Sequence, residues 1–195
     1  MTPEAQKKAA ARAEIARRPP EGPEDLPLVV RCIVWPIVAP MLPTAYNNNY
    51  QILQTPGYVT ILTEMIHDVR VIPLDGRPHL PENIRQLLGD SRGQWEGNTL
   101  VVDTTNFTDK APFSNCDRNL HLIERFTRTD ANTILYQFTV EDPTAFTRTW
   151  KGEVPLRKTQ EPIYVYTCHE GNYAMENILK GARAQEKEAA KKEPR

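Results

Sequence analysis

Residues 67–79, HDVRVIPLDGRPH, carry two histidines, two aspartates and two arginines within thirteen positions. An Asp75-Gly76 turn divides this stretch, and such a turn brings the residues on its two sides to one end of a sheet. Imidazoles and carboxylates held close together act as general acids and bases or as ligands of a transition metal. The alternative is a polar turn between two strands that does no chemistry.

Two more segments carry residues of the same types. Glu64 and His67 belong to YVTILTEMIH, whose two faces are both mostly apolar, and a polar group on a buried strand is costly unless it has a partner. The candidate general acids and bases are Glu64, His67, His79 and His169. For Glu64 the alternative is a satisfied ion pair in the core, with Arg70 or Arg125. His121 alternates with Ile123 on a strand and is interpreted as structural.

Three histidines from separate segments, His67, His79 and His169, also suit a metal site. This pattern predicts a divalent transition metal, Zn or Cu, as a possible cofactor. The chain has no HxH, HExxH or CxxC motif. The alternative is therefore a metal-free polar pocket in which these histidines form hydrogen bonds.

A further set of residues is suited to holding a ligand. Arginine binds anionic or polar groups, the amide of asparagine both donates and accepts, and tryptophan offers a flat surface for a ring. The candidate ligand-binding residues are Asn49, Arg70, Arg77, Asp90, Arg92 and Trp95. For the Gly-rich segment 89–100 the alternative is a structural turn whose tryptophan closes the fold.

The elements that must position these residues are strands. Segments rich in β-branched and aromatic residues alternate with turn signals such as Pro56-Gly57 and Asp142-Pro143. They predict strands over residues 50–55, 58–66, 69–74, 99–107, 120–129, 133–141, 146–156 and 163–169, and a short helix over 82–90. About eight antiparallel strands indicate a mainly β fold, either a barrel able to hold one small ligand or a strongly curved sandwich.

The ends of the chain have a different composition. Residues 1–27 are expected to form a helical N-terminal extension and linker, because residues 3–18 are rich in Ala, Glu and Lys and a Pro-rich stretch follows them. The β-barrel domain is expected over residues 28–172. Residues 173–195 are expected to form a C-terminal helix with a charged tail.

Charge and hydropathy exclude several classes of partner. With 24 basic and 25 acidic residues the net charge is −1, so we expect no nucleic-acid partner. The longest apolar run, PLVVRCIVWPIVAPML, is broken by Arg31 and by prolines, so we expect no membrane span. The first residues lack the apolar core of a signal peptide, which suggests a cytosolic protein or a mature form with an added Met.

The chain has three cysteines, Cys32, Cys116 and Cys168. An odd number permits at most one internal disulfide and leaves one free thiol. A bridge between Cys32 and Cys168 would join the two ends of the body. Three reduced thiols are the alternative.

Three stretches of the sequence are similar to those of a known family: residues 46–107, NLHLIERFTR and CHEGNY. They resemble a family of uncharacterised, usually exported proteins of soil bacteria, notably Acidobacteria, over about residues 28–185. The resemblance implies a periplasmic or secreted protein, favours the Cys32–Cys168 bridge and makes fragments of plant or microbial polymers plausible substrates. The strand pattern is also similar to that of lipocalin-like (calycin) barrels with N- and C-terminal helices, a likeness of fold that says little about function.

These observations predict an enzyme with a polar pocket in a β-barrel. It would act as a lyase or hydrolase, by acid/base or metal-assisted chemistry, on a carbohydrate or another small hydroxylated or phenolic compound. The first alternative is a non-catalytic, lipocalin-like protein that binds a small molecule or saccharide. The second is a purely structural polar cluster. The sequence leaves the oligomeric state open, with a homodimer as one possibility.

Overall fold

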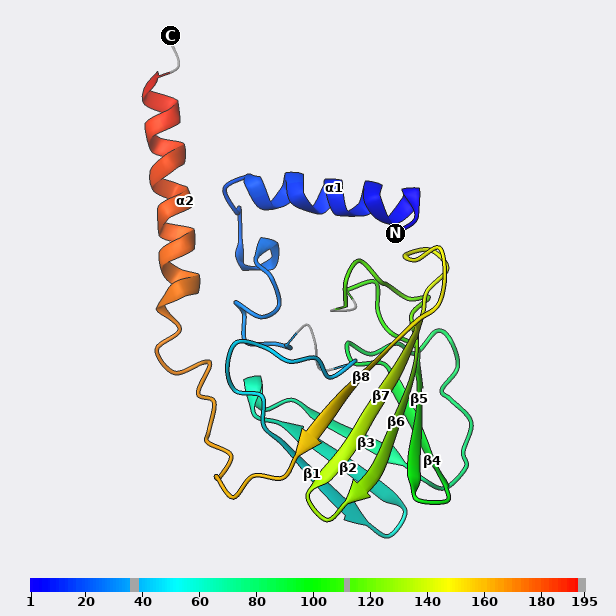
Figure 1. The fold of residues 1–195 in the computed structure, drawn as a ribbon. Coiled ribbons are helices and arrows are strands. Elements are labelled where there is room, and N and C mark those ends of the chain that lie inside the picture. The colour runs from blue at the N-terminus through cyan, green and yellow to red at the C-terminus, as the bar shows by residue number, and fades with distance from the viewer. Residues whose placement is uncertain (36–38, 111–112, 193–195) are drawn as a thin grey trace.

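The structure is a computed structural model, which describes residues 1–35, 39–110 and 113–192. Within these ranges it has eight strands in two antiparallel sheets, and two α-helices (Figure 1). The three-stranded sheet contains β1 (Tyr50–Thr55), β2 (Tyr58–Thr63) and β3 (Val69–Pro73). The five-stranded sheet contains β4 (Asp90–Glu96), β5 (Thr99–Thr105), β6 (His121–Asp130), β7 (Thr133–Glu141) and β8 (Trp150–Arg157). In both sheets, strands that follow one another in sequence are neighbours in space.

The prediction of a mainly β fold is confirmed, and every expected strand except the last is present. Residues 163–169 do not form a strand. Tyr164 donates its backbone N–H to a side chain, the carboxylate of Glu64, rather than to a neighbouring strand. The helix expected over residues 82–90 is also wrong, because residues 82–83 and 87–88 form turns, Gln86 forms an isolated bridge with Phe107, and Asp90 begins β4.

Strand β4 was not expected, because its segment is rich in glycine and charge, both of which are unfavourable in strands. The strand forms by pairing with β5, and Gly93 explains how it fits against β3. A Cβ atom at this position would lie 2.7 Å from the side chains of both Ile72 and Leu74, so only glycine allows β4 to approach the end of β3 this closely.

The two sheets face one another across a shared core (Figure 1). Alternation along each strand directs every second side chain inward, toward the facing sheet. The buried apolar residues of these inner faces include Val59, Ile61, Ile72, Leu100, Val102, Phe138 and Val140. Each such side chain contributes about 1.5–3 kcal/mol when it is fully buried.

A closed barrel is not confirmed. Among the described residues, β3 and β4 belong to different sheets, and β1 pairs only with β2. Pro155 in β8 supplies a physical reason why β8 does not pair with β1. Proline lacks an N–H, so within sheets it lies on edge strands with its ring on the unpaired side. β8 therefore pairs with β7 and leaves its other edge open toward β1.

Helix α1 (Pro3–Arg17) begins at Thr2, whose hydroxyl oxygen accepts a hydrogen bond from the backbone N–H of Ala5 at 3.1 Å. Ala5 is fully buried in the core. Lys8 Nζ lies 2.6 Å from a carboxylate oxygen of Asp117. The first two turns of the N-terminal helix are thus packed onto the body.

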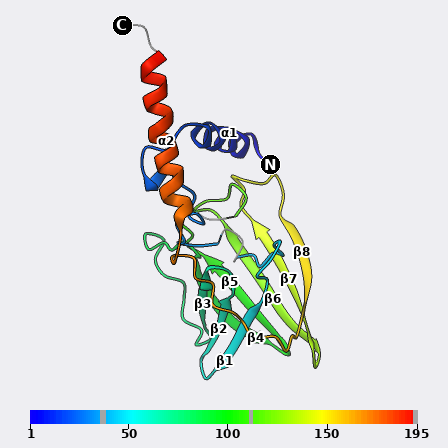
Figure 2. The same cartoon turned by 90° about the vertical axis from the view of Figure 1, so that its left-hand side faces the viewer.

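Helix α2 (Tyr173–Lys192) projects away from the sheets (Figure 2). One stripe of the helix is covered, with Met175 and Leu179 half-buried and Ala182 buried. Arg183 donates hydrogen bonds to the backbone carbonyls of residues 20 and 21. None of the helices in the described residues combines the length and the apolar character that crossing a membrane requires.

Candidate functional site

A cleft of about 880 Å³ lies where β1 and β8 fail to meet. This volume is typical of small-molecule sites, which span roughly 300–1,000 Å³. Its apolar wall includes Ile52, Ile134, Val154 and Leu156. Its amide groups come from Asn48, Asn49, Gln51 and Asn132, and its charged groups from Arg128, Arg157, Lys158 and Glu161. An apolar wall with a few polar groups suits a ring or short chain that carries hydroxyl or charged substituents.

The strand alternation that builds the core also builds this cleft. Ile134 and Leu156 occupy inner positions of β7 and β8 and pair directly across the two strands. Ile52 occupies an inner position of β1, opposite the buried Ile61. Further along the sheets the same inner positions are covered by the opposite sheet. At this end they line the cleft, so these apolar side chains remain partly exposed.

Asn49 is the residue of the predicted ligand-binding set that lines the cleft. Its amide Nδ2 donates to Glu64 Oε2 at 2.9 Å, and Glu64 Oε1 accepts from the backbone N–H of Tyr164 at 3.4 Å. Glu64 is buried. The Glu64 carboxylate therefore joins the residue before β1 to the segment that follows β8.

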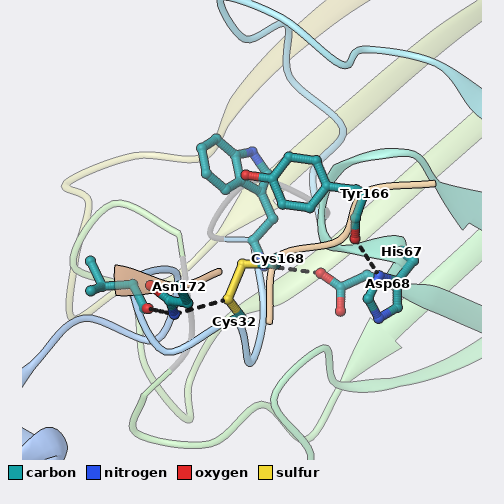
Figure 3. Close-up of a disulfide and its surroundings, with 8 residues drawn as sticks. Cys32, His67, Asp68, Tyr166, Cys168 and Asn172 are labelled. Atoms are coloured by element: carbon teal, nitrogen blue, oxygen red, sulfur yellow. Dashed lines mark hydrogen bonds between the residues drawn. A yellow bond between two sulfur atoms is a disulfide. The ribbon is translucent and has the colours of Figure 1, made fainter. Parts of the chain in front are cut away.

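His67 lies in a strained turn beside the disulfide (Figure 3). Ile66 and His67 have φ values of +57° and +48°, a region that costs energy for residues with a side chain. His67 Nδ1 is 3.2 Å from the backbone oxygen of Tyr166. The carboxylate of the next residue, Asp68, accepts from the backbone N–H of Trp35 at 2.9 Å, and burial raises the pKa of Asp68 to about 6.

The bridge between Cys32 and Cys168 is present, with Cα atoms 5.7 Å apart (Figure 3). It spans 136 positions of sequence. Asn172 donates from Nδ2 to the backbone oxygen of Val30 at 2.9 Å, which holds the same two segments together. Cys116 is a free, buried thiol, and burial raises its pKa. Of the two alternatives left open by the sequence, the structure contains the disulfide.

A row of carboxylates and imidazoles crosses the outer face of the five-stranded sheet. Asp103 of β5 lies at its centre, where His79 Nε2 is 2.8 Å from Oδ1 and His121 Nε2 is 2.9 Å from Oδ2. His79 Nδ1 lies 3.0 Å from a carboxylate oxygen of Asp90. His121 Nδ1 lies 3.1 Å from a carboxylate oxygen of Glu141. We call these five residues the imidazole–carboxylate row.

Each imidazole of the row faces two carboxylates, whereas a neutral imidazole carries only one N–H. At His121, both contacts are satisfied as hydrogen bonds only when the ring is protonated. The hydrogen bond with Asp103 raises the pKa of His121, and the same bond lowers the pKa of Asp103. With every ring nitrogen of His79 and His121 placed against a carboxylate, the row resembles a clamp on the sheet more than a site that receives a ligand, and at His121 this clamp depends on a proton.

This arrangement predicts a pH-dependent effect of His121→Gln. Since the pKa of His121 in the folded protein is raised above its ordinary value of 6.5, the stabilising contribution of this side chain is fully present below about pH 6.5. It is lost as the pH rises through the folded-state pKa. His121→Gln should therefore cost about 1 kcal/mol or less near pH 6, because the pair is partly exposed, and less near pH 9.

Urea unfolding of both proteins at the two pH values measures this difference. His169→Gln is the matched control, because His169 is exposed and lies outside the row. The control variant should differ from the parent protein by the same small amount at both pH values. A cost of His121→Gln that grows toward alkaline pH would contradict the clamp.

Arg70 lies in the core and pairs with Glu124, not with Glu64. The side chains of Arg70 and Glu124 are 2% and 0% exposed, and Arg70 Nη1 donates to Glu124 Oε1 at 3.0 Å. The hydroxyl of Tyr136 donates to the same Oε1 at 2.8 Å and accepts from the backbone N–H of Met41 at 2.9 Å. A core ion pair therefore exists, as the alternative interpretation held, but with a different carboxylate.

The other predicted ligand-binding residues lie outside the cleft. Arg77 pairs with Asp75 at the surface, next to the turn. Arg92 Nη1 lies 2.6 Å from Asp90 Oδ1, so these two residues form an ion pair at one end of the imidazole–carboxylate row. Trp95 is exposed at the end of β4.

The predicted metal ligands have separate surroundings. His67 contacts the backbone of Tyr166, His79 contacts Asp90 and Asp103, and His169 follows the disulfide. Within residues 1–35, 39–110 and 113–192, no three His, Cys, Asp or Glu side chains are grouped to hold a metal ion. The assignment of Zn or Cu to the three histidines stays a prediction.

Sequence reasoning missed the apolar wall and the basic residues of the cleft. Ile134, Leu156, Arg128 and Lys158 look like ordinary strand-end residues. The available signal was alternation, which places all four on one face of the sheet. No family model, no curated protein and no solved structure matches this chain.

Proposed function

We propose that this protein binds a small hydroxylated or phenolic compound in the cleft between β1 and β8. The observation that carries the proposal is the cleft itself, about 880 Å³ with an apolar wall and amide groups at its edge. A ring would pack against Ile52 and Leu156, and its hydroxyl groups would exchange hydrogen bonds with Asn49 and Asn132. The ligand would then lie between two facing sheets, as in a lipocalin-like binding protein.

The positions of the predicted acids and bases favour binding over catalysis. A general acid or base must come within hydrogen-bond reach of the group that it protonates or deprotonates. Glu64, His67, His79 and His169 are not among the described residues that line the cleft. The carboxylate that does line it, Glu161, is exposed. A lyase or hydrolase would need its reactive groups at the ligand, so we place binding ahead of turnover.

We further propose that the protein works in an oxidising compartment, in the periplasm or outside the cell. The Cys32–Cys168 bridge supports this location, since disulfides persist where thiols are not kept reduced. The resemblance to exported soil-bacterial proteins favours the same location. Polymer fragments that carry phenolic or sugar hydroxyl groups would be available there as ligands.

The apolar fluorescent probe phenylnaphthylamine tests the cleft directly. We expect it to bind the parent protein with enhanced fluorescence, and Ile52→Glu to weaken that binding by at least about tenfold, because a carboxylate would replace part of the apolar wall. Leu53→Glu is the matched control. Leu53 is the next residue of β1 and faces the opposite side, and the two side chains are comparably exposed, at 36% and 47%.

Circular dichroism checks that both variants remain folded. If Ile52→Glu and Leu53→Glu bind the probe equally well, the cleft between β1 and β8 is not the binding site. If the parent protein does not bind the probe at all, the proposal of a small-molecule site with an apolar wall is wrong.

A further inference from the structure

The cleft is positively charged in a protein whose net charge is −1. Three basic side chains line it, from Arg128, Arg157 and Lys158, against one exposed carboxylate, Glu161. We infer that the ligand is an amphipathic organic anion, an aromatic or aliphatic body with a carboxylate or sulfonate group, bound with its charge toward Arg128 and Lys158. This inference rests on the proposed binding function of the same cleft.

The register of the strands places charge directly beside the apolar wall. Arg128 pairs with Ile134 across β6 and β7, and Ile134 pairs with Leu156 across β7 and β8. Directly paired side chains on one face of a sheet have Cβ atoms about 4.5–5.5 Å apart. Lys158 follows Leu156 by two positions, and its backbone N–H donates to Asn132 O at 2.8 Å. Two cations therefore flank the Ile134–Leu156 pair.

The guanidinium of Arg128 is oriented without being neutralised. Arg128 Nε donates to the backbone oxygen of Asp130 at 3.2 Å, and Nη2 donates to the backbone oxygen of Ala131 at 3.0 Å. Carbonyl oxygens accept these bonds but carry no full negative charge, so the positive charge of Arg128 stays available to a ligand. A guanidinium held in one orientation loses little conformational freedom when it binds a carboxylate.

The salt bridges found in the described part of the chain do not include Lys158 or Arg128. Arg157 differs, because it lies near the carboxylate of Asp130. Hydrogen bonds from Asn132 and Thr133 are the main reason why the pKa of Asp130 is lowered, and the positive charge of Arg157 contributes to the same effect. We therefore assign recognition of the anion to Arg128 and Lys158, and we regard Arg157 as a partner of Asp130.

The apolar wall determines which anion fits. An inorganic anion would contact the basic groups and leave Ile52 and Leu156 uncovered. A neutral ring would cover the wall and leave two cations without a partner in a partly enclosed space. An amphipathic anion suits both the basic groups and the apolar wall, because charge-assisted hydrogen bonds form at one end of the ligand while apolar surface is buried at the other.

Two fluorescent probes with the same aromatic body separate the contribution of the anionic group from that of the apolar body. Anilinonaphthalene sulfonate carries a sulfonate group, and phenylnaphthylamine is its neutral counterpart. We expect the parent protein to bind the sulfonate at least about tenfold more tightly. The double variant Arg128→Gln/Lys158→Gln should lose this preference and keep its affinity for the neutral probe within about twofold. About 1 M NaCl, where the Debye length is about 3 Å, should reduce the preference in the parent protein.

The matched control is the double variant Arg125→Gln/Lys151→Gln. Arg125 lies on β6, as Arg128 does, and Lys151 lies on β8, which ends one residue before Lys158. The control pair carries the same total charge, but its positions alternate to the outer face. The control should retain the preference for the sulfonate. A loss of preference in the control as large as in Arg128→Gln/Lys158→Gln would overturn the inference, because net charge alone would then explain it.

The two proposals fail in different ways. Equal affinities of the parent protein for both probes, with binding still abolished by Ile52→Glu, would overturn the anion preference and leave the binding cleft standing. Binding of both probes that is insensitive to Ile52→Glu would overturn the cleft as the site, and the anion preference with it.

Discussion

Replacement of Arg70 by Met is expected to lower the free energy of unfolding by about 3–5 kcal/mol. The substitution leaves Glu124 with no exposed surface and without its cationic partner. Tyr136 would still donate one hydrogen bond to this carboxylate, but its hydroxyl cannot neutralise the charge. An uncompensated buried carboxylate either pays this cost or takes up a proton, so the penalty should shrink as the pH falls.

Urea unfolding at neutral pH measures the effect of Arg70→Met, and two further variants identify its origin. The double variant Arg70→Met/Glu124→Leu should recover most of the loss, because it removes both buried charges and keeps apolar volume. Arg125→Met removes one partner of the exposed Glu96–Arg125 pair and should cost about 1 kcal/mol or less. If Arg70→Met costs no more than Arg125→Met, the core pair is not desolvated as the structure describes.

Loss of the Cys32–Cys168 bridge is expected to have an effect of similar size. For cysteines separated by 136 positions, the loop-entropy model gives about 5 kcal/mol, and removal of a native disulfide commonly costs about 2–5 kcal/mol. Folded domains are stable by only about 5–15 kcal/mol, so the reduced protein should be close to unfolding at about 37 °C.

The measurement compares urea midpoints with and without dithiothreitol, for the parent protein and for Cys32→Ala/Cys168→Ala. Dithiothreitol should lower the midpoint of the parent protein to that of the double variant and leave the variant unchanged, since Cys116 is a free, buried thiol. An identical midpoint for the oxidised and reduced parent protein would show that the bridge does not stabilise the fold.

Local patterns predicted most of the strands, because alternation and turn chemistry are local properties of a chain. β4 was missed because the reason for its glycine lies in β3, in the side chains of Ile72 and Leu74. The segment 163–169 has strand-like composition, but it makes scattered bonds to Glu64 and His67 instead of a ladder. Closure of the barrel depends on pairing between distant edges, and Pro155 was a local sign against it.

The site was predicted in part, and the misses have a common cause. Asn49 was chosen for its amide and does line the cleft, whereas Asp90 and Arg92 were chosen to hold a ligand and pair with each other outside the cleft. Asp103 was not singled out, because its importance comes from the register that places it between two histidines. The inward position of Glu124, next to Leu122 on alternating LHLIERF, was a readable signal for a buried carboxylate in need of a cation.

The position of the disulfide has a mechanical consequence. A force that pulls on the two ends of this chain would pass from Cys32 to Cys168 through one covalent bond, and all eight strands lie between these residues. While the bond is intact, tension can extend only the terminal segments. Cleavage of the bond would release 136 residue spacings, about 450–490 Å of extended chain. For a protein tethered at its ends, the chain between the two cysteines, which includes the strands on either side of the cleft, could therefore not be extended until that one bond is reduced.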